Sequence, residues 1–260
     1  GGTELAITEA ATLAGPGADL LTISGNLTDR ILFIDSPAGA TVIRGVTLAN
    51  GHAIGAGNSG AGGAILMSGA GSTLLVEDCH ITGNIADSFG GGIATVAGST
   101  TIRNSTISGN VINATEHGGG GIYNAADLTL LNSTISGNGA VDSTTSGGGG
   151  ILNTGTLQLL HSTVTGNRAN PAVGGGGIYG TGAETLRNSI VAGNFEGTGT
   201  DPSDIGGGSI DTATHTLVGD AGSSGGIVHG TDGNLVGDAG SGTVDIATVL
   251  DPVLVVRGGV

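Results

Sequence analysis

One seven-residue phrase returns four times at nearly constant spacing in this chain of 260 residues. NSTISGN stands at 104–110 and again at 132–138, and the variants HSTVTGN and NSIVAGN follow at 161–167 and 188–194. A catalytic site is made once, whereas a repeat of about 20–50 residues is typical of one structural unit stacked on itself. The spacing therefore predicts a solenoid.

A second phrase, a run of glycines followed by isoleucine, recurs in step with the first. The stretch from each such Ile to the Asn that closes the next SGN-type phrase is nearly constant, as in Ile122–Asn138 and Ile151–Asn167. The stretch from that Asn to the next Ile varies more, as Asn84–Ile93 and Asn138–Ile151 illustrate. One side of the unit is thus nearly fixed in length and the other is not. This is typical of a framework that carries one variable loop per turn.

Alternating apolar residues within the constant side predict short strands, as in Leu128–Ser136, where two strands flank a polar corner. Aligning the units places aliphatic residues in three columns. The columns are Ile23, Leu48, Ile81, Ile107, Ile135, Val164 and Val191; Ile43, Val76, Ile102, Leu130, Leu159 and Leu186; and Ile65, Ile93, Ile122, Ile151 and Ile178.

Three short strands per turn, each with an inward aliphatic residue, describe a three-sided coil. Coils stacked in parallel at about 4.8 Å per turn enclose a dry aliphatic centre. The glycine runs suit corners that need positive φ or close backbone approach. The recurring Asn104, Asn132 and Asn188 suit an amide ladder between turns.

The composition limits what such a coil can bind. With 56 Gly, five Phe and Tyr together and no Trp, its core has to consist of aliphatic residues in thin layers. The net charge is −15, and the six basic residues are all Arg, which excludes the clustered cations that nucleic acid requires. No apolar run is as long as the roughly 18 residues of a membrane-spanning helix, so we expect no membrane insertion. A single cysteine, Cys79, leaves no intrachain disulfide.

The phrases GPGADLLTISGN, NSTISGN and GGGGIYN, with the tail NSIVAGN, LVGDAG, NLVGDAG and DPVL, resemble bacterial surface proteins with right-handed parallel β-helix repeats. They are similar in particular to secreted proteins whose C-termini carry one of several interchangeable cell-surface anchors. The resemblance covers roughly Gly15 to Leu254 and implies an extracellular or cell-surface location in bacteria. The segment that often precedes GPGADLL is missing and no anchor follows DPVLVVRGGV, so we expect the ordered middle of a larger architecture.

The repeat phrase stops after Asn194, which divides the chain into regular coils at 1–195 and a less regular continuation at 196–260. We expect about seven to ten coils in all. LVGDAG occurs at Leu217 and at Leu235, a spacing too short for a full coil of the same type. Runs such as HGTDGNLVGDAG invite a calcium-binding interpretation, but the tandem nonapeptide of a calcium β-roll is absent. Turn carboxylates are the alternative, and the sequence indicates no other cofactor.

The sequence offers only part of the set of residues that a polysaccharide-active enzyme needs. Parallel β-helices often act on polysaccharides, which takes paired carboxylates or a tuned base, and we assign no catalytic residue. Arg44, Glu77 and Arg103 share one column on successive turns, as an alternating charge ladder or a surface ion-pair stack. On the variable side, four residues suit a cation or a sugar, or else serve as solvated loop tips. These four are Asp87, Glu116, His117 and Asp142.

Two further features bear on function. Outward positions beside the first column read Thr22-x-Ser24, Thr106-x-Ser108, Thr134-x-Ser136 and Thr163-x-Thr165, which resembles the threonine arrays of ice-binding β-helical proteins. Neither end of the chain shows an amphipathic capping helix, and an uncapped solenoid exposes strand edges that favour head-to-tail filaments. The leading hypothesis is a non-enzymatic structural or adhesive segment that stacks on itself or contacts surface glycans. The alternatives are a polysaccharide-binding or lyase-like β-helix and, behind it, ice binding.

Overall fold

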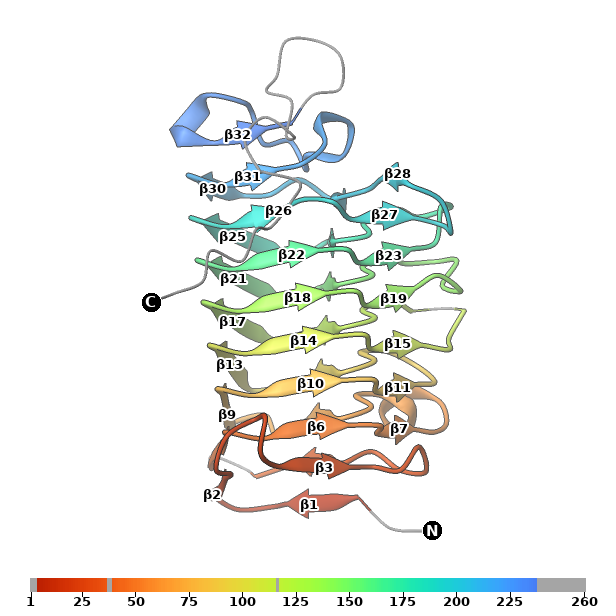
Figure 1. Cartoon of the computed structure of the whole chain (residues 1–260), viewed down its shortest axis with the longest axis vertical. Helices are drawn as coiled ribbons and strands as arrows, with labels where there is room; N and C mark the ends of the chain where they lie inside the picture. Colours follow the sequence, from red (N-terminus) through yellow and green to blue (C-terminus); the bar gives the residue numbers. More distant parts are fainter. Residues whose placement is uncertain (1–3, 37–38, 116, 238–260) are drawn as a thin grey trace.

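The chain winds into a parallel β-solenoid of about eight turns. A computed structural model describes residues 4–36, 39–115 and 117–237. Near-side strands run from left to right while the coil climbs from the N-terminus at the bottom, which makes it right-handed (Figure 1). Among the described strands only one, β28, pairs antiparallel to its neighbour. The predicted all-β, right-handed parallel β-helix with three strands per coil is confirmed.

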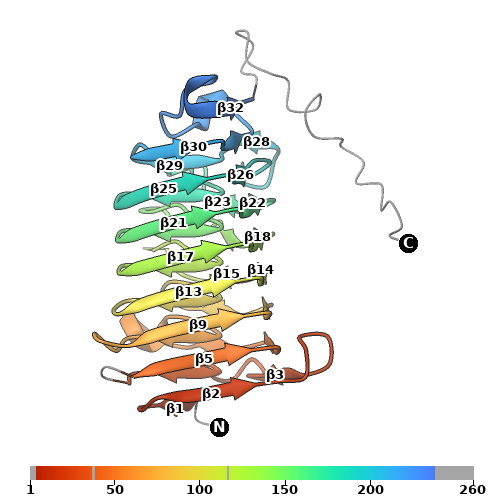
Figure 2. The ribbon, with the colours of Figure 1, turned by 90° about the vertical axis from the view of Figure 1, so that its left-hand side faces the viewer.

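Three sheets surround the core, and each receives one strand from every regular coil. Sheet A consists of β1 (Leu5–Ile7), β4 (Leu32–Ile34), β8 (Ile65–Met67), β12 (Ile93–Thr95), β16 (Ile122–Asn124), β20 (Ile151–Asn153), β24 (Ile178–Gly180) and β29 (Ile205–Gly207). Sheet B, which faces the viewer in Figure 2, consists of β2 (Ala11–Ala14), β5 (Ala40–Arg44), β9 (Thr73–Glu77), β13 (Ser99–Arg103), β17 (Asp127–Leu131), β21 (Thr156–Leu160), β25 (Ala183–Arg187) and β30 (Thr212–Thr214).

Sheet C has one strand more than sheets A and B. It consists of β3 (Thr22–Ser24), β6 (Thr47–Ala49), β10 (His80–Thr82), β14 (Thr106–Ser108), β18 (Thr134–Ser136), β22 (Thr163–Thr165), β26 (Ile190–Val191), β31 (Leu217–Val218) and β32 (Leu235–Val236).

The strand register places the three predicted aliphatic columns in these sheets. In sheet C, Ile81 pairs with Leu48 on one side and Ile107 on the other. Ile102 in sheet B and Ile93 in sheet A pair with their column neighbours in the same way. From Ile43 to Val191 the column residues are fully buried and form one continuous core. Burial of aliphatic area at about 25 cal/mol per Å² is the main stabilising term for such a stack.

A fourth sheet, which the sequence did not indicate, lies between sheets C and A. Sheet D consists of β7 (His52–Ala53), β11 (Ile85–Ala86), β15 (Val111–Ile112), β19 (Gly139–Ala140), β23 (Arg168–Ala169), β27 (Phe195–Glu196) and β28 (Asp201–Pro202). Its strands are too short to show the alternation by which a sequence reveals a strand. The variable loops begin at this sheet. One of them turns back over sheet A, where the Phe89 ring lies 4.4 Å from that of Tyr123 and packs with Leu66 and Ala94.

Five of the seven residues of NSTISGN have a structural role that the coil makes plain. The first Asn occupies a corner with φ near 50°, the left-handed region that Asn, Asp and His tolerate best. The following Ser is buried, and in consecutive coils its Oγ accepts a hydrogen bond from the backbone of the coil before, as from Ser105 N to Ser133 Oγ at 3.2 Å. The Ile enters the core, and the Gly takes φ near 63°. The last Asn is fully buried.

The C-terminal part departs from this regularity in two places. β27 and β28 form a short antiparallel hairpin at the end of sheet D. The two LVGDAG phrases lie side by side, since Leu217 pairs with Leu235 and Val218 with Val236. The short coil between them contributes a strand to sheet C only, and its remaining length contains the 3-10 turns η2 (Ala221–Ser223) and η3 (Thr231–Gly233). η1 (Gly57–Gly60) lies near the other end, in a loop after β7.

Candidate functional site

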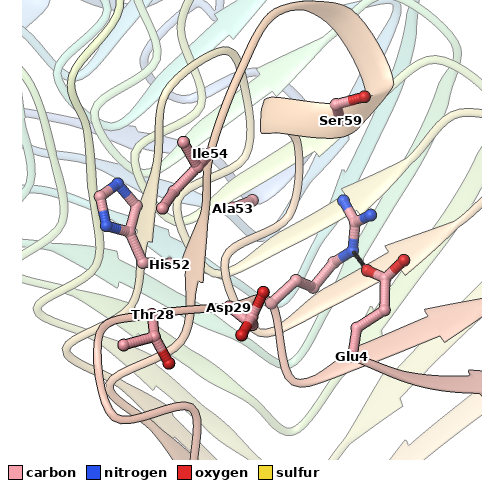
Figure 3. Close-up of a pocket in the computed structure, with 8 residues that line it drawn as sticks. Glu4, Thr28, Asp29, His52, Ala53, Ile54 and Ser59 are labelled. Carbon is pink, nitrogen blue, oxygen red and sulfur yellow. Dashed lines mark hydrogen bonds and ion pairs between the residues drawn. The ribbon is translucent and has the colours of Figure 1, made fainter. Parts of the chain in front are cut away.

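Two hollows open on the loop side of the first coils, next to sheet D. The first has a volume of about 300 Å³ and is lined by Glu4, Thr28, Asp29, Arg30, His52, Ala53, Ile54 and Ser59 (Figure 3). The second has a similar volume of about 300 Å³ and is lined by Gly55, Ala56, Gly57, Asp87, Ser88, Asn113, Ala114, Thr115 and His117. The segment 52–57 therefore contributes to both of them.

Arg30 stabilises the wall of the first hollow. Its Nε lies 2.5 Å from Glu4 Oε2, and its Nη1 donates to the carbonyl oxygens of Asn58 at 2.9 Å and Ala61 at 2.5 Å. Only 9% of Arg30 is exposed. The guanidinium thus ties the chain before β1 and the loop around η1 to the second coil, because a buried cation has to be paired and hydrogen-bonded. These contacts give Arg30 a structural role.

His52 and Asp87 form the link between the two hollows. His52 Nε2 lies 2.9 Å from Asp87 Oδ1, and Gly55 N donates to Asp87 Oδ2 at 3.2 Å. Both carboxylate oxygens are engaged, although the side chains keep about 21% and 31% of their surface exposed. Such partly exposed donors and acceptors, with the hydroxyls of Thr28, Ser59 and Ser88 nearby, suit hydrogen bonding to a polyhydroxylated ligand.

The four residues singled out on the variable side are not all brought together. Asp87 and His117 line the second hollow, where the His117 ring also meets Phe89 edge-on at 5.6 Å. Asp142 is exposed in the loop after β19 and does not line this hollow. Glu116 lies outside the described residues. In the described part of the chain, no three His, Cys, Asp or Glu side chains are grouped so that they could hold a metal ion.

The charge column on sheet B follows the predicted register. Glu77 pairs with Arg44 on one side and Arg103 on the other. The ion pair joins Glu77 Oε1 to Arg103 Nη2 at 2.6 Å, and the Arg103 side chain is 42% exposed. The Glu77 side chain is 18% exposed, so the pair is half-buried. A pair that keeps this much contact with solvent contributes about 1 kcal/mol or less to stability and creates no reactive group.

The structure contains two asparagine columns of very different character. At the exposed corners, Asn132 Nδ2 lies 3.5 Å from Asn104 Oδ1, and His161 separates Asn132 from Asn188 in that column. The buried ladder consists of the Asn that closes each phrase. In it, every Nδ2 donates at 2.9 Å to the Oδ1 of the next coil, through Asn84, Asn110, Asn138, Asn167, Asn194 and finally Asp204. The recurrence of SGN was the sequence signal for it, but spacing alone does not say which column faces inward.

A buried carboxylate lies at the end of each of two buried asparagine ladders. Asp204 accepts hydrogen bonds from Asn194 N and Nδ2, and burial raises its pKa to about 6. Glu184 accepts from Asn153 Nδ2 at 2.5 Å, at the end of a shorter ladder that begins at Asn124, and burial raises its pKa too. Both groups are held by amide donors inside the coil, so they do not face the hollows as catalytic acids.

The threonine and serine positions form a regular array on the outside of sheet C. Thr106 pairs with Thr134 and Thr134 with Thr163, while Ser108, Ser136 and Thr165 align beside them. All six side chains are half-buried. His80 Nε2, 2.8 Å from Ser108 Oγ, and Ile190 interrupt the array on either side.

Comparison with protein-family models, with curated proteins and with solved structures finds no match to this chain. Within the described residues, no helix combines the length and apolar character needed to cross a bilayer.

Proposed function

We propose that the chain is a non-enzymatic, extracellular structural or adhesive segment of a bacterial surface protein, and that copies stack end to end. The amide ladder and the aliphatic core support a structural role, since both continue from coil to coil and stiffen the stack along its axis. The resemblance of the repeat phrases to bacterial surface proteins supports the location.

The observation that carries this proposal is the character of the two ends. In the described residues, β1, β2 and β3 each have one neighbouring strand, so their outer edges are unpaired. Among the residues that the structure describes, eight large apolar side chains are exposed, of which four lie in the first coil and two in the last. These six are Leu5, Leu20, Leu21, Leu27, Val228 and Leu235. Open edges flanked by exposed leucines favour pairing with a further strand. Where that strand belongs to another copy, a contact between unlike ends gives an open filament.

Electron microscopy of the full chain over a concentration series, with light scattering alongside, tests this proposal. We expect filaments as thick as one solenoid that lengthen with concentration. Single rods at every concentration would remove self-assembly and leave the structural role without a mechanism of assembly.

A second candidate is polysaccharide binding on the loop side. The adjoining hollows around the His52–Asp87 pair favour it, since they offer mixed polar donors and acceptors along two coils. A glycan-binding and cleavage panel with the parent, Asp87→Asn and Asp142→Asn tests it. Binding that only Asp87→Asn weakens supports the hollow, whereas equal loss in both variants indicates a general charge effect.

A third candidate is ice binding, which the aligned hydroxyls of sheet C favour. Measurement of thermal hysteresis for the parent and for Thr134→Tyr tests it. The tyrosine should abolish any activity by disturbing a flat array, and absence of hysteresis in the parent removes the candidate.

A further inference from the structure

We infer that the second hollow selects sugars with free amino groups, and that Asp87 on its floor binds the protonated amine. The inference rests on the polysaccharide binding proposed above as the second candidate, and it names the class of polysaccharide. Asp87 and His117 both line this hollow, which opens beside β11 and β15 of sheet D.

The second hollow exists because one loop is shorter than its two neighbours. The connection from sheet D to sheet A comprises 54–64 after β7, 87–92 after β11 and 113–121 after β15. The short middle loop supplies the floor with Asp87 and Ser88, and the longer loops supply the walls. The strands from which the two walls leave are two coils apart, a separation of about 10 Å. The missing length of the middle loop thus leaves room for one extended sugar chain.

Asp87 is held in place without being saturated. Its Oδ1 lies 2.9 Å from His52 Nε2, and its Oδ2 accepts a hydrogen bond from Gly55 N at 3.2 Å. A carboxylate offers about four lone-pair sites, so about two remain for a ligand. The side chain keeps 31% of its surface exposed. A protonated amine brings three N–H donors and the opposite charge, and such a charged hydrogen bond is roughly twice as strong as a neutral one.

The charges around the second hollow disfavour acidic sugars. No Lys or Arg is among the described residues that line it. Arg30 lines the first hollow, but its guanidinium is already bound to Glu4 and to two carbonyl oxygens. Sugar carboxylates need a free Arg or Lys for strong recognition, and the net charge of −15 repels them further. The same net charge attracts a polymer that carries ammonium groups.

The walls favour a sugar over a basic peptide. Asn113 and Thr115 are exposed on one wall, where they offer amide and hydroxyl groups. The opposite wall consists of Gly55, Ala56 and Gly57, and a Cβ on Gly57 would meet nothing within 4 Å. Small residues on one side and polar groups on the other suit a hydroxylated ring. A basic peptide would use the charge of the floor and leave these groups without partners.

Isothermal titration calorimetry of the full chain with soluble glucosamine oligomers tests the inference. Three comparison ligands have the same number of units. N-acetylglucosamine oligomers lack the charge, galacturonic acid oligomers reverse it, and oligolysine carries it without the sugar ring. We expect the glucosamine oligomers to bind about fivefold or more tightly than each of the three. Added salt should reduce this preference, because it screens a partly exposed carboxylate.

Three variants locate the binding site, each checked for folding by circular dichroism. Asp87→Asn keeps the size and an acceptor for Gly55 N, so it should weaken glucosamine binding about fivefold or more and leave the N-acetylated oligomers unchanged. Asp142→Asn removes an exposed carboxylate that does not line the hollow and should change affinity less than about twofold. Ala56→Tyr fills the hollow without changing the charge and should weaken both kinds of oligomer.

The outcomes separate this inference from polysaccharide binding itself. Equal or tighter binding of N-acetylated or acidic oligomers, weakened by Ala56→Tyr, overturns the selection of amino sugars and leaves polysaccharide binding intact. Equal losses in Asp87→Asn and Asp142→Asn, or oligolysine that binds as tightly as glucosamine oligomers, assign the affinity to charge alone and overturn the site. Absence of binding to every oligomer overturns both proposals.

Discussion

Asn110 Nδ2 and Asn110 N both donate to the same atom, Asn138 Oδ1, at 2.9 and 3.0 Å. Asn138 repeats this arrangement toward Asn167, and its Nδ2 also donates to the Ile107 carbonyl at 3.0 Å. Each amide therefore satisfies buried groups in two neighbouring coils. A fully satisfied polar network inside a low-dielectric core specifies the register that purely aliphatic columns would leave less defined.

The first prediction concerns this ladder. Asn138→Ala removes the acceptor of two buried N–H groups and the donor to Ile107 O, so unfolding free energy should fall by about 3 kcal/mol or more. Urea denaturation followed by circular dichroism measures the change. Asn132→Ala, at the exposed corner, is the matched control and should cost about 1–2 kcal/mol at most, the strain of a non-glycine residue at φ near 50°. Equal losses in the two variants would contradict the ladder.

The second prediction concerns pH. Asp204 has its folded-state pKa raised to about 6 by burial, above the ordinary value of 3.8. Protonation therefore favours the folded state: this stabilisation is complete below about pH 4 and is lost as pH rises through 6. Asp204→Asn keeps an acceptor for Asn194 without the buried charge. We expect the variant to be more stable than the parent at pH 7, by about 3 kcal/mol at most.

This advantage should shrink steadily as pH falls toward 4, when urea melts of the two proteins are compared across that range. The control is Asp201→Asn, a nearby exposed carboxylate, whose difference from the parent should stay small at each pH. If the effect of Asp204→Asn on the unfolding free energy does not depend on pH, that effect does not come from burial of the charged carboxylate.

The third prediction concerns glycine packing. A Cβ on Gly121 would lie 2.7 Å from the Gly150 carbonyl oxygen and 3.0 Å from Asn138 Cγ, so Gly121→Ala has to displace backbone or the buried amide. We expect a loss of about 1–3 kcal/mol. At Gly139 a Cβ meets only Val111 Cγ1 at 3.5 Å, an ordinary contact, so Gly139→Ala should be neutral or slightly stabilising. Thermal unfolding of both variants checks the contrast.

The fourth prediction separates two arginines. Arg103→Gln should change unfolding free energy by about 1 kcal/mol or less, because the Arg103 side chain is 42% exposed and solvent screens its ion pair with Glu77. Arg30→Gln leaves Glu4 and two carbonyl oxygens without their buried partner, so it should cost about 3 kcal/mol and increase hydrogen exchange in β1. Unchanged exchange in β1 would show that Arg30 does not hold the first coil.

Much of the coil could be predicted from the period of the sequence. Ile81, Ile107 and Ile135 recur at nearly equal intervals, and parallel stacking turns that spacing into direct pairing. Sheet D escaped prediction because strands as short as His52–Ala53 show no alternation. The two hollows could not be predicted from the sequence either, because the loops that form them do not repeat.

By itself the sequence determined the parallel stack, the three aliphatic columns and the alignment of Arg44, Glu77 and Arg103, since a constant period sets translation along the solenoid axis. Only the tertiary structure decided which asparagine column is buried. Both columns repeat at the same interval, and they differ only in whether their side chains point toward the core or toward solvent. The tertiary structure also decided that Asp204, which follows Asn194 far sooner than a full coil would allow, ends the ladder, because the β27–β28 hairpin shortens the path between them. Contacts made through irregular connections depend on the path of the chain, and no period records that path.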